Sequence, residues 1–219
     1  IYTFKYNADK HWFIDYNSRE TSEFFDNTYL NPEQTRDRTT YWAVTNTVGV
    51  SLLEGFHKLA KFGLAAYLTH QVRRYDFTPD TLDRANLALT PFPEGFEPFG
   101  DHLTQQLAWA GAQLTKQKGS LLRYEATAEL GFLGDAAGEI KADGNVSTQF
   151  KFWGDSLRLK AFGAFSNTTA PVLMQRYISN HFVWRNDFDK IRNFTFGAEL
   201  TVGRSGTRLR ASLANIQNH

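Results

Sequence analysis

Ser179, Asn180 and His181 are three adjacent residues whose types could carry out covalent chemistry. A hydroxyl, an amide and an imidazole are the groups of a Ser-His-Asn hydrolase, in which the histidine activates the serine and the third group orients the ring. We expect this run to lie on a strand, where Ser179 and His181 share one face and Asn180 points to the other. No orienting relay then forms among the three, so no catalytic residue is predicted here. An outer-membrane barrel hydrolase, with a triad completed by distant residues, stays open as a remote alternative.

Other signals for catalysis, metals and cofactors are missing from the sequence. There is no nucleophile elbow, no phosphate-binding glycine loop and no paired-histidine zinc helix. The six histidines are scattered, and the absence of cysteine excludes thiolate metal sites and disulfides. A formal net charge of +1 argues against nucleic acid as a partner. We therefore expect a protein that is not an enzyme and that binds no cofactor and no metal.

Charged and apolar residues alternate along the second half of the chain. The segments 121–132 and 140–152 change between a polar and an apolar side chain at nearly every residue. A period of two is typical of a strand with one dry and one wet face. We expect the wet face to line a lumen through Arg123, Glu125, Glu129, Glu139, Lys141, Asp143, Lys151, Arg158, Lys160, Glu199, Arg208 and Arg210. We expect the dry face to contact lipid through Leu122, Tyr124, Ala126, Ala128, Leu130, Phe132, Val146, Phe150 and Phe152.

The make-up of the dry face favours lipid over the interior of a soluble all-β domain, which is the alternative. Small residues such as Ala128 and Gly144 occupy its middle, and aromatic residues such as Tyr124 and Phe152 lie towards its ends. A soluble core needs interlocking bulk, whereas acyl chains flow around small residues and aromatic rings settle at the headgroup level. No stretch reaches the roughly 18 apolar residues of a membrane helix. The sequence therefore predicts an all-β fold, an antiparallel transmembrane β-barrel.

Turn residues divide the chain into consecutive hairpins, which predicts a meander of antiparallel strands. We expect one domain, 1–219, with strands over residues 1–16, 39–51, 58–75, 102–116, 120–132, 138–152, 156–166, 172–186, 192–202 and 207–214. A polar stretch that ends at Asp37 is expected to be a loop or a periplasm-side excursion.

Only one connection is expected to be long, Asp76 to Asp101, whose prolines keep it from pairing as strands. We place this loop outside the cell or folded into the lumen. Its phenylalanines are expected to anchor it in the mouth of the barrel or on a neighbouring protein: Phe77, Phe92, Phe96 and Phe99.

The charges of the wet face must be solvated or paired, because a buried, unpaired charge is costly. A water-filled channel would solvate them, and a lumen closed by cross-strand salt bridges would pair them. Both signs interleave along the sequence, so we expect no strong ion selectivity.

Two runs of residues make the pattern more specific. They are Tyr177 to Phe188, preceded by Phe152 to Leu157, and Asn46 to Leu64, preceded by Thr35 to Asp37. With these runs the chain resembles the β-barrel porins of Bacteroidota outer membranes over most of its length. The resemblance implies a large outer-membrane barrel with a pore role. It also implies that the present chain, which is short for this family, is an internal portion of a larger barrel.

These observations predict a porin-like channel in the bacterial outer membrane for passive diffusion of small hydrophilic solutes. Outer-membrane lipid is then its main partner. The alternative is a plugged barrel that acts as a structural or docking subunit of an outer-membrane complex, with other outer-membrane proteins as partners.

Overall fold

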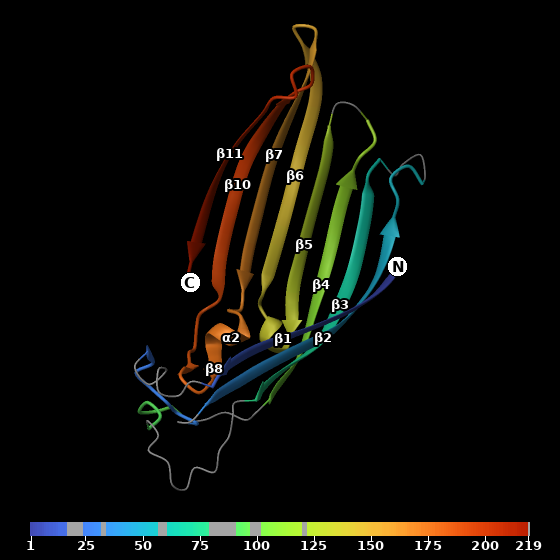
Figure 1. Cartoon of the computed structure of the whole chain (residues 1–219). Coiled ribbons are helices and arrows are strands. Elements are labelled where there is room, and N and C mark those ends of the chain that lie inside the picture. Colours follow the sequence, from blue (N-terminus) through green and yellow to red (C-terminus); the bar gives the residue numbers. More distant parts are fainter. Residues whose placement is uncertain are drawn as a thin grey trace.

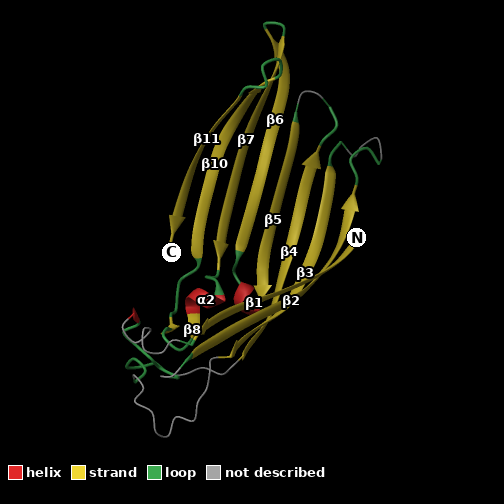
Figure 2. Cartoon of the chain, viewed as in Figure 1, coloured by secondary structure: helices red, strands yellow, loops and turns green. Residues whose placement is uncertain are grey.

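The main element of the computed structural model is one antiparallel sheet (Figures 1 and 2). The structure describes residues 1–16, 24–31, 34–56, 61–78, 91–96, 102–119 and 122–218. Within these residues, nine strands pair in the order β1-β2-β3-β4-β5-β6-β7-β10-β11. Their bounds are β1 Tyr2–Asp15, β2 Thr35–Leu52, β3 Gly63–Thr78, β4 His102–Lys116, β5 Arg123–Leu133, β6 Ile140–Phe152, β7 Asp155–Thr168, β10 Ile191–Val202 and β11 Arg208–Gln217.

This order confirms the predicted all-β antiparallel meander, because neighbours in the sheet follow one another along the chain except where β7 pairs with β10. The sheet is strongly curved, and β1 and β2 sweep across one end of it towards the segment between β7 and β10 (Figure 1). The sheet is not closed. In the part of the chain that the structure describes, β1 and β11 each have one unpaired edge.

The two ends of the sheet differ in their connections. At one end, which we call the short-turn end, β6 joins β7 through residues 153–154 and β10 joins β11 through residues 203–207. At the other, the long-loop end, the connections span residues 16–34, 79–101 and 169–190, besides a short 3-10 turn, η2 (Gly134–Ala136). The expectation of one long connection is therefore wrong.

Two boundaries also differ from expectation at the long-loop end. Asp76 to Thr78 continue β3 and do not begin the loop, and β2 begins at Thr35, ahead of the predicted strand start. The connection before β2 and the connection before β4 therefore both lie at the long-loop end of the sheet. Phe99, one of the predicted anchors, lies outside the described residues.

Hydrogen bonds link two adjacent connections at the short-turn end. The backbone N–H groups of Gln117 and Lys118 donate hydrogen bonds of 2.7 and 3.0 Å to one carboxylate oxygen of Glu54. These bonds favour the charged form and lower the pKa of Glu54. The β2–β3 and β4–β5 connections are thereby tied together through a side chain.

The predicted strand over residues 172–186 is wrong. Pro171 precedes a single helical turn, α2 (Val172–Gln175), and two short strands, β8 (Arg176–Ile178) and β9 (Val183–Arg185), form a separate hairpin. The Ser179 hydroxyl bonds the backbone N–H and C=O of Phe182, which closes the turn of this hairpin. We call residues 171–186 the strap. No helix in the described residues is long and apolar enough to cross a membrane.

Candidate functional site

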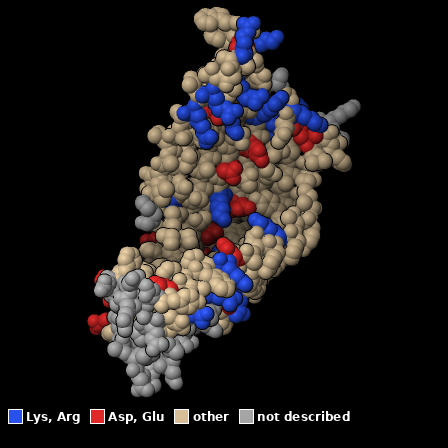
Figure 3. Space-filling view, viewed as in Figure 1, with Lys and Arg blue, Asp and Glu red and all other residues tan. Residues whose placement is uncertain are grey.

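Strand register divides the sheet into a polar face and an apolar face. Residues directly opposite one another share a face, so Lys160, its neighbour Glu199 on β10 and Arg210 beyond it on β11 lie on the same side. In Figure 3 charged side chains gather in the hollow of the molecule. The same register places these predicted residues on this polar face: Arg123, Glu125, Glu129, Lys141, Asp143, Lys151, Arg158, Lys160, Glu199, Arg208 and Arg210.

The residues expected to face lipid lie on the opposite side of the same strands. This apolar face carries Tyr124, Ala126, Ala128, Leu130, Phe132, Val146, Phe150 and Phe152. Leu122 and Glu139 precede β5 and β6 and lie outside the strand ladder. Glu139 still joins the polar side, because its carboxylate accepts hydrogen bonds from Trp109 and from the backbone N–H of Thr169, each 3.0 Å long.

Acidic residues form a belt in the middle of the polar face and towards its long-loop end. We call Glu125, Glu129, Glu139 and Asp143 the acidic belt. Glu129 accepts a 3.0 Å hydrogen bond from the Tyr67 hydroxyl, and Glu125 accepts one of 2.8 Å from Gln113. The Tyr67 ring reaches Glu129 by lying over Gly111, where a Cβ atom would collide with it. Neutral donors thus hold these carboxylates in place.

One cation lies within this belt. The Lys141 ammonium is 3.9 Å from the Glu139 carboxylate and 5.3 Å from the centre of the Trp109 ring. Trp109 therefore contacts both partners of this ion pair, as a hydrogen-bond donor to the carboxylate and as a cation–π acceptor for the ammonium.

Cations dominate the polar face nearer the short-turn end. Arg123, Lys160 and Arg210 occupy one row across the sheet, and Arg158 and Arg208 the next row towards the turns. With Lys151 we call these residues the cationic band. The carboxylate among them, Glu199, lies 3.5 Å from Arg208. The band and the belt meet at a polar hollow of about 250 Å³, lined by Asp143, Lys160, Glu199 and Arg210 among others.

This arrangement corrects the expectation of interleaved charges. Both signs occur along the sequence, but the register collects most of the cations and most of the carboxylates into different zones along the strands. The expectation of no strong ion selectivity depended on an even mixture of signs, which this arrangement does not have.

The strap folds over the polar face at the long-loop end. Val172 and Ile178 of the strap pack against Phe77 of β3, and all three side chains are buried. Phe92, from the segment between β3 and β4, packs on this cluster and stacks on Tyr29 at 5.5 Å between ring centres. Phe77 and Phe92 thus pack within this chain, and Phe77 does so from β3 and not from the loop to which it was assigned. The strap joins β7 and β10 yet is held against β3.

A buried polar cluster ties the tip of the strap to the start of β2. The Asn180 amide oxygen accepts hydrogen bonds from the backbone N–H groups of Leu30 (3.1 Å) and Asn31 (2.8 Å). Its NH₂ group donates to the Asn31 carbonyl and to the Thr35 hydroxyl, both at 2.8 Å. The Asn180 backbone N–H donates to Asp37 at 2.9 Å. A single side chain thus satisfies several main-chain groups of a segment about 150 positions away.

His181 completes this cluster. Its ring nitrogens lie 2.8 Å from the Thr35 hydroxyl and 2.8 Å from the Asn27 carbonyl, and its ring stacks on Phe25 at 4.1 Å. Ser179, Asn180 and His181 lie on a turn and not on a strand, which corrects the expected facing. Each of the three side chains makes a hydrogen bond within this cluster or its turn.

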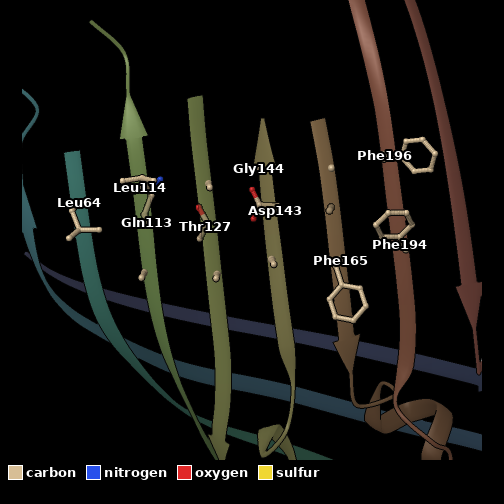
Figure 4. A pocket seen from close by; sticks show the side chains of 15 residues that line it. Leu64, Gln113, Leu114, Thr127, Asp143, Gly144, Phe165, Phe194 and Phe196 are labelled. Carbon is tan, nitrogen blue, oxygen red and sulfur yellow. The ribbon is translucent and has the colours of Figure 1, made fainter. Parts of the chain in front are cut away.

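The apolar face carries a shallow depression over its small residues (Figure 4). It has a volume of about 570 Å³ and is floored by Ala and Gly of β4 to β7, with Leu64 and Leu114 at one side and Phe165, Phe194 and Phe196 at the other. Large apolar side chains elsewhere on this face are about half exposed, as at Phe132 (54%) and Phe152 (52%). Such a face is suited to an apolar surrounding.

Sequence reasoning missed the residues that shape the polar side, chiefly Tyr67, Trp109 and Asn180. Their hydrogen-bond partners lie far away in the sequence, and no spacing of residues along the chain indicates these pairs. The one local signal was Ser179-Asn180, a pair typical of turns, inside the supposed strand. Within the described residues, no group of three or more His, Asp or Glu side chains could hold a metal ion.

Comparison with known proteins gives one match. The model of a family described as "Putative porin" matches residues 1–219, which agrees with the resemblance seen in the sequence. The searches of curated proteins and of solved structures gave no match.

Proposed function

This chain belongs to the porin family whose model matches residues 1–219, and we propose that it forms the wall of a transmembrane β-barrel that passes small hydrophilic solutes by diffusion. The observation that carries this proposal is the division of one sheet into a charged, hollow face and an apolar, exposed face. Charged side chains would then meet water in the lumen, and the apolar side chains would meet acyl chains. The proposed site is a bacterial outer membrane, and the Bacteroidota assignment rests on the sequence resemblance.

The unequal ends of the sheet support an orientation. Outer-membrane barrels have short periplasmic turns and longer extracellular loops. We therefore place the short-turn end at the periplasm, and the strap and residues 79–101 at the outer mouth. Hydrocarbon does not tolerate unpaired strand edges, so further strands would cover the free edges of β1 and β11 in the membrane.

Planar-bilayer recording of the full-length protein tests the pore. Stepwise, ohmic current is expected. Silence in a folded, inserted sample would overturn the diffusion pore and favour the second candidate, a plugged barrel that docks other outer-membrane proteins. The strap, which lies across the polar face at the long-loop end, is the observation that favours this second candidate.

Reversing charges in the cationic band should change which ions carry the current. Lys151 and Arg158 lie on the polar face, opposite Ser156 and Gln149. The double variant Lys151→Glu/Arg158→Glu should shift the permeability ratio severalfold towards cations, since rings of fixed charge set ion preference in pores. Reversal potentials in a KCl gradient measure this shift.

Lys116→Glu is a single charge reversal on the other face and serves as the control, because Lys116 ends β4 on the apolar face, opposite Tyr124. Its reversal potential should stay that of the unmodified protein. An equal shift in both variants would mean that the polar face does not line the ion path.

A further inference from the structure

The outer, apolar face carries a basic and aromatic patch at the long-loop end of β1 to β3. Register places Lys10, Arg36, Arg38 and Arg74 on this face, since they alternate with polar-face residues such as Asp37 and Thr39. Trp12 is paired directly with Arg38, and Trp42 with Arg74. The carboxylate among them, Asp76, accepts a 2.7 Å hydrogen bond from Arg74. The patch thus has a clear excess of positive charge on a face that is otherwise apolar.

The position of the patch along the strand matches the edge of a membrane. On β2 the outward side chains from Trp42 to Leu52 are apolar except Asn46, whose amide oxygen accepts a 2.7 Å hydrogen bond from the Tyr2 hydroxyl. That run has the length of a membrane-crossing strand, about 9–11 residues. Arg38 and Arg36 come next along the same face, beyond Thr40. They would therefore lie at the level of the lipid headgroups.

Aromatic rings support the two arginines of β2. The Arg38 guanidinium carbon lies 5.7 Å from the centre of the Trp12 ring, and that of Arg36 lies 5.9 Å from the Tyr16 ring. Trp12 and Tyr16 are more than half exposed, and both arginines are exposed. These rings contact each guanidinium at the surface of the sheet, where its N–H groups remain exposed to an anion. Arg36 and Arg38 lie two residues apart on one face of β2, about 7 Å along the strand, so both side chains can reach the same phosphate group.

We propose that Lys10, Arg36 and Arg38 bind the phosphate of an anionic lipid headgroup on the outside of the barrel. Phosphate oxygens accept paired hydrogen bonds from guanidinium in the same way as carboxylates do, and Trp12 and Trp42 would contact the lipid just below the phosphate. This inference rests on the proposed function only in that the apolar face must lie in a membrane. Conduction of solutes plays no part in it.

Binding of phosphatidic acid to the full-length protein in detergent, followed by native mass spectrometry, tests the site. Diacylglycerol with the same acyl chains is the matched ligand, because it lacks only the phosphate. The unmodified protein should bind phosphatidic acid and not diacylglycerol. Arg36→Gln/Arg38→Gln should weaken that binding about tenfold or more, whereas Lys151→Gln/Arg158→Gln, which removes the same charge from the polar face, should leave it unchanged.

A heat-modifiability assay reports whether each variant is folded. If the Gln variant does not fold, Arg36→Lys/Arg38→Lys keeps the charge without the forked geometry, and its binding should still fall severalfold. Equal binding by the unmodified and the altered protein, or displacement of the lipid by an equal concentration of inorganic phosphate, would overturn the proposal. A barrel that is silent in the bilayer but binds phosphatidic acid would refute the pore and retain the lipid site.

Discussion

Ala128→Arg is expected to destabilise the membrane-inserted protein by about 2–4 kcal/mol, the cost of an arginine near the bilayer midplane on the lipid side of a barrel. Ala128 lies in the middle of β5 on the apolar face, opposite Ala112 and Ala142. No carboxylate of these neighbouring positions can pair with an arginine there. Urea unfolding in lipid vesicles measures the free energy of unfolding directly.

Thr127→Arg, one residue earlier, is the matched control. Thr127 faces the polar side, between Gln113 and Asp143. An arginine there gains a carboxylate partner across the strand pair, so its free energy of unfolding should change little. A harmless Ala128→Arg together with a strongly destabilising Thr127→Arg would mean that the two faces have been assigned the wrong way round.

Asn180→Ala should release the strap. The Asn180 side chain is 1% exposed and bonds main-chain groups of Leu30 and Asn31 together with Thr35. Alanine would leave these buried groups without partners, at about 1–3 kcal/mol for each group that water cannot reach. We expect the strap to become cleavable by protease at far lower concentrations, while the sheet itself stays folded. In the bilayer, single-channel conductance should rise, because the strap no longer stays packed on the polar face.

Asn186→Ala serves as the control within the same segment, since the exposed Asn186 amide makes a single 3.1 Å bond, to the Met174 carbonyl. Its cleavage rate and conductance should resemble those of the unmodified protein. Asn180→Asp keeps the acceptor for Leu30 and Asn31 but loses the donor, and it places a second carboxylate near Asp37. The strap of the Asn180→Asp variant should be released almost as readily as the strap of the alanine variant. Unchanged proteolysis in both Asn180 variants would show that the strap is held by its apolar contacts alone.

The strands of the sheet could be predicted because the information is local. Alternation of Arg123, Glu125 and Glu129 with Tyr124, Ala126 and Ala128 specifies both the strand and the residues that share a face. Hairpin turns such as Trp153-Gly154 then follow from glycine at positive φ, here 76° at Gly154. Antiparallel meander order follows from consecutive hairpins.

The strap could not be predicted in the same way. Residues 172–186 are as apolar and β-prone as a membrane strand, and their turn at Ser179-Asn180 resembles a polar interruption on a wet face. Contacts with residues far away in the sequence decide the conformation of this segment. Asn180 forms its hydrogen bonds around Thr35, and Val172 packs against Phe77. Local strand propensity is overridden where tertiary contacts bury the segment more favourably.

The zoning of charge depends on register, which the sequence does not state. The length of each turn decides whether Lys160 lies opposite Glu199 or opposite another residue of β10. A slip of the strand pairing by one residue would change the partner of every residue on the strand. The face of each charge was predictable from its own strand, whereas its neighbours required the structure.

The number of strands in this sheet limits how the barrel that we propose could close. Among the described residues, nine antiparallel strands give β1 and β11 the same direction, so a seam made directly between them would be parallel. A second copy of this sheet in the same orientation would also meet the first with parallel seams, because each of its outer strands runs the same way as the strand it would join. A ring that is antiparallel throughout therefore needs an odd number of additional strands, which gives the even total usual in bacterial outer membranes. The odd number of strands in this sheet thus argues against a barrel that is closed by two copies of it.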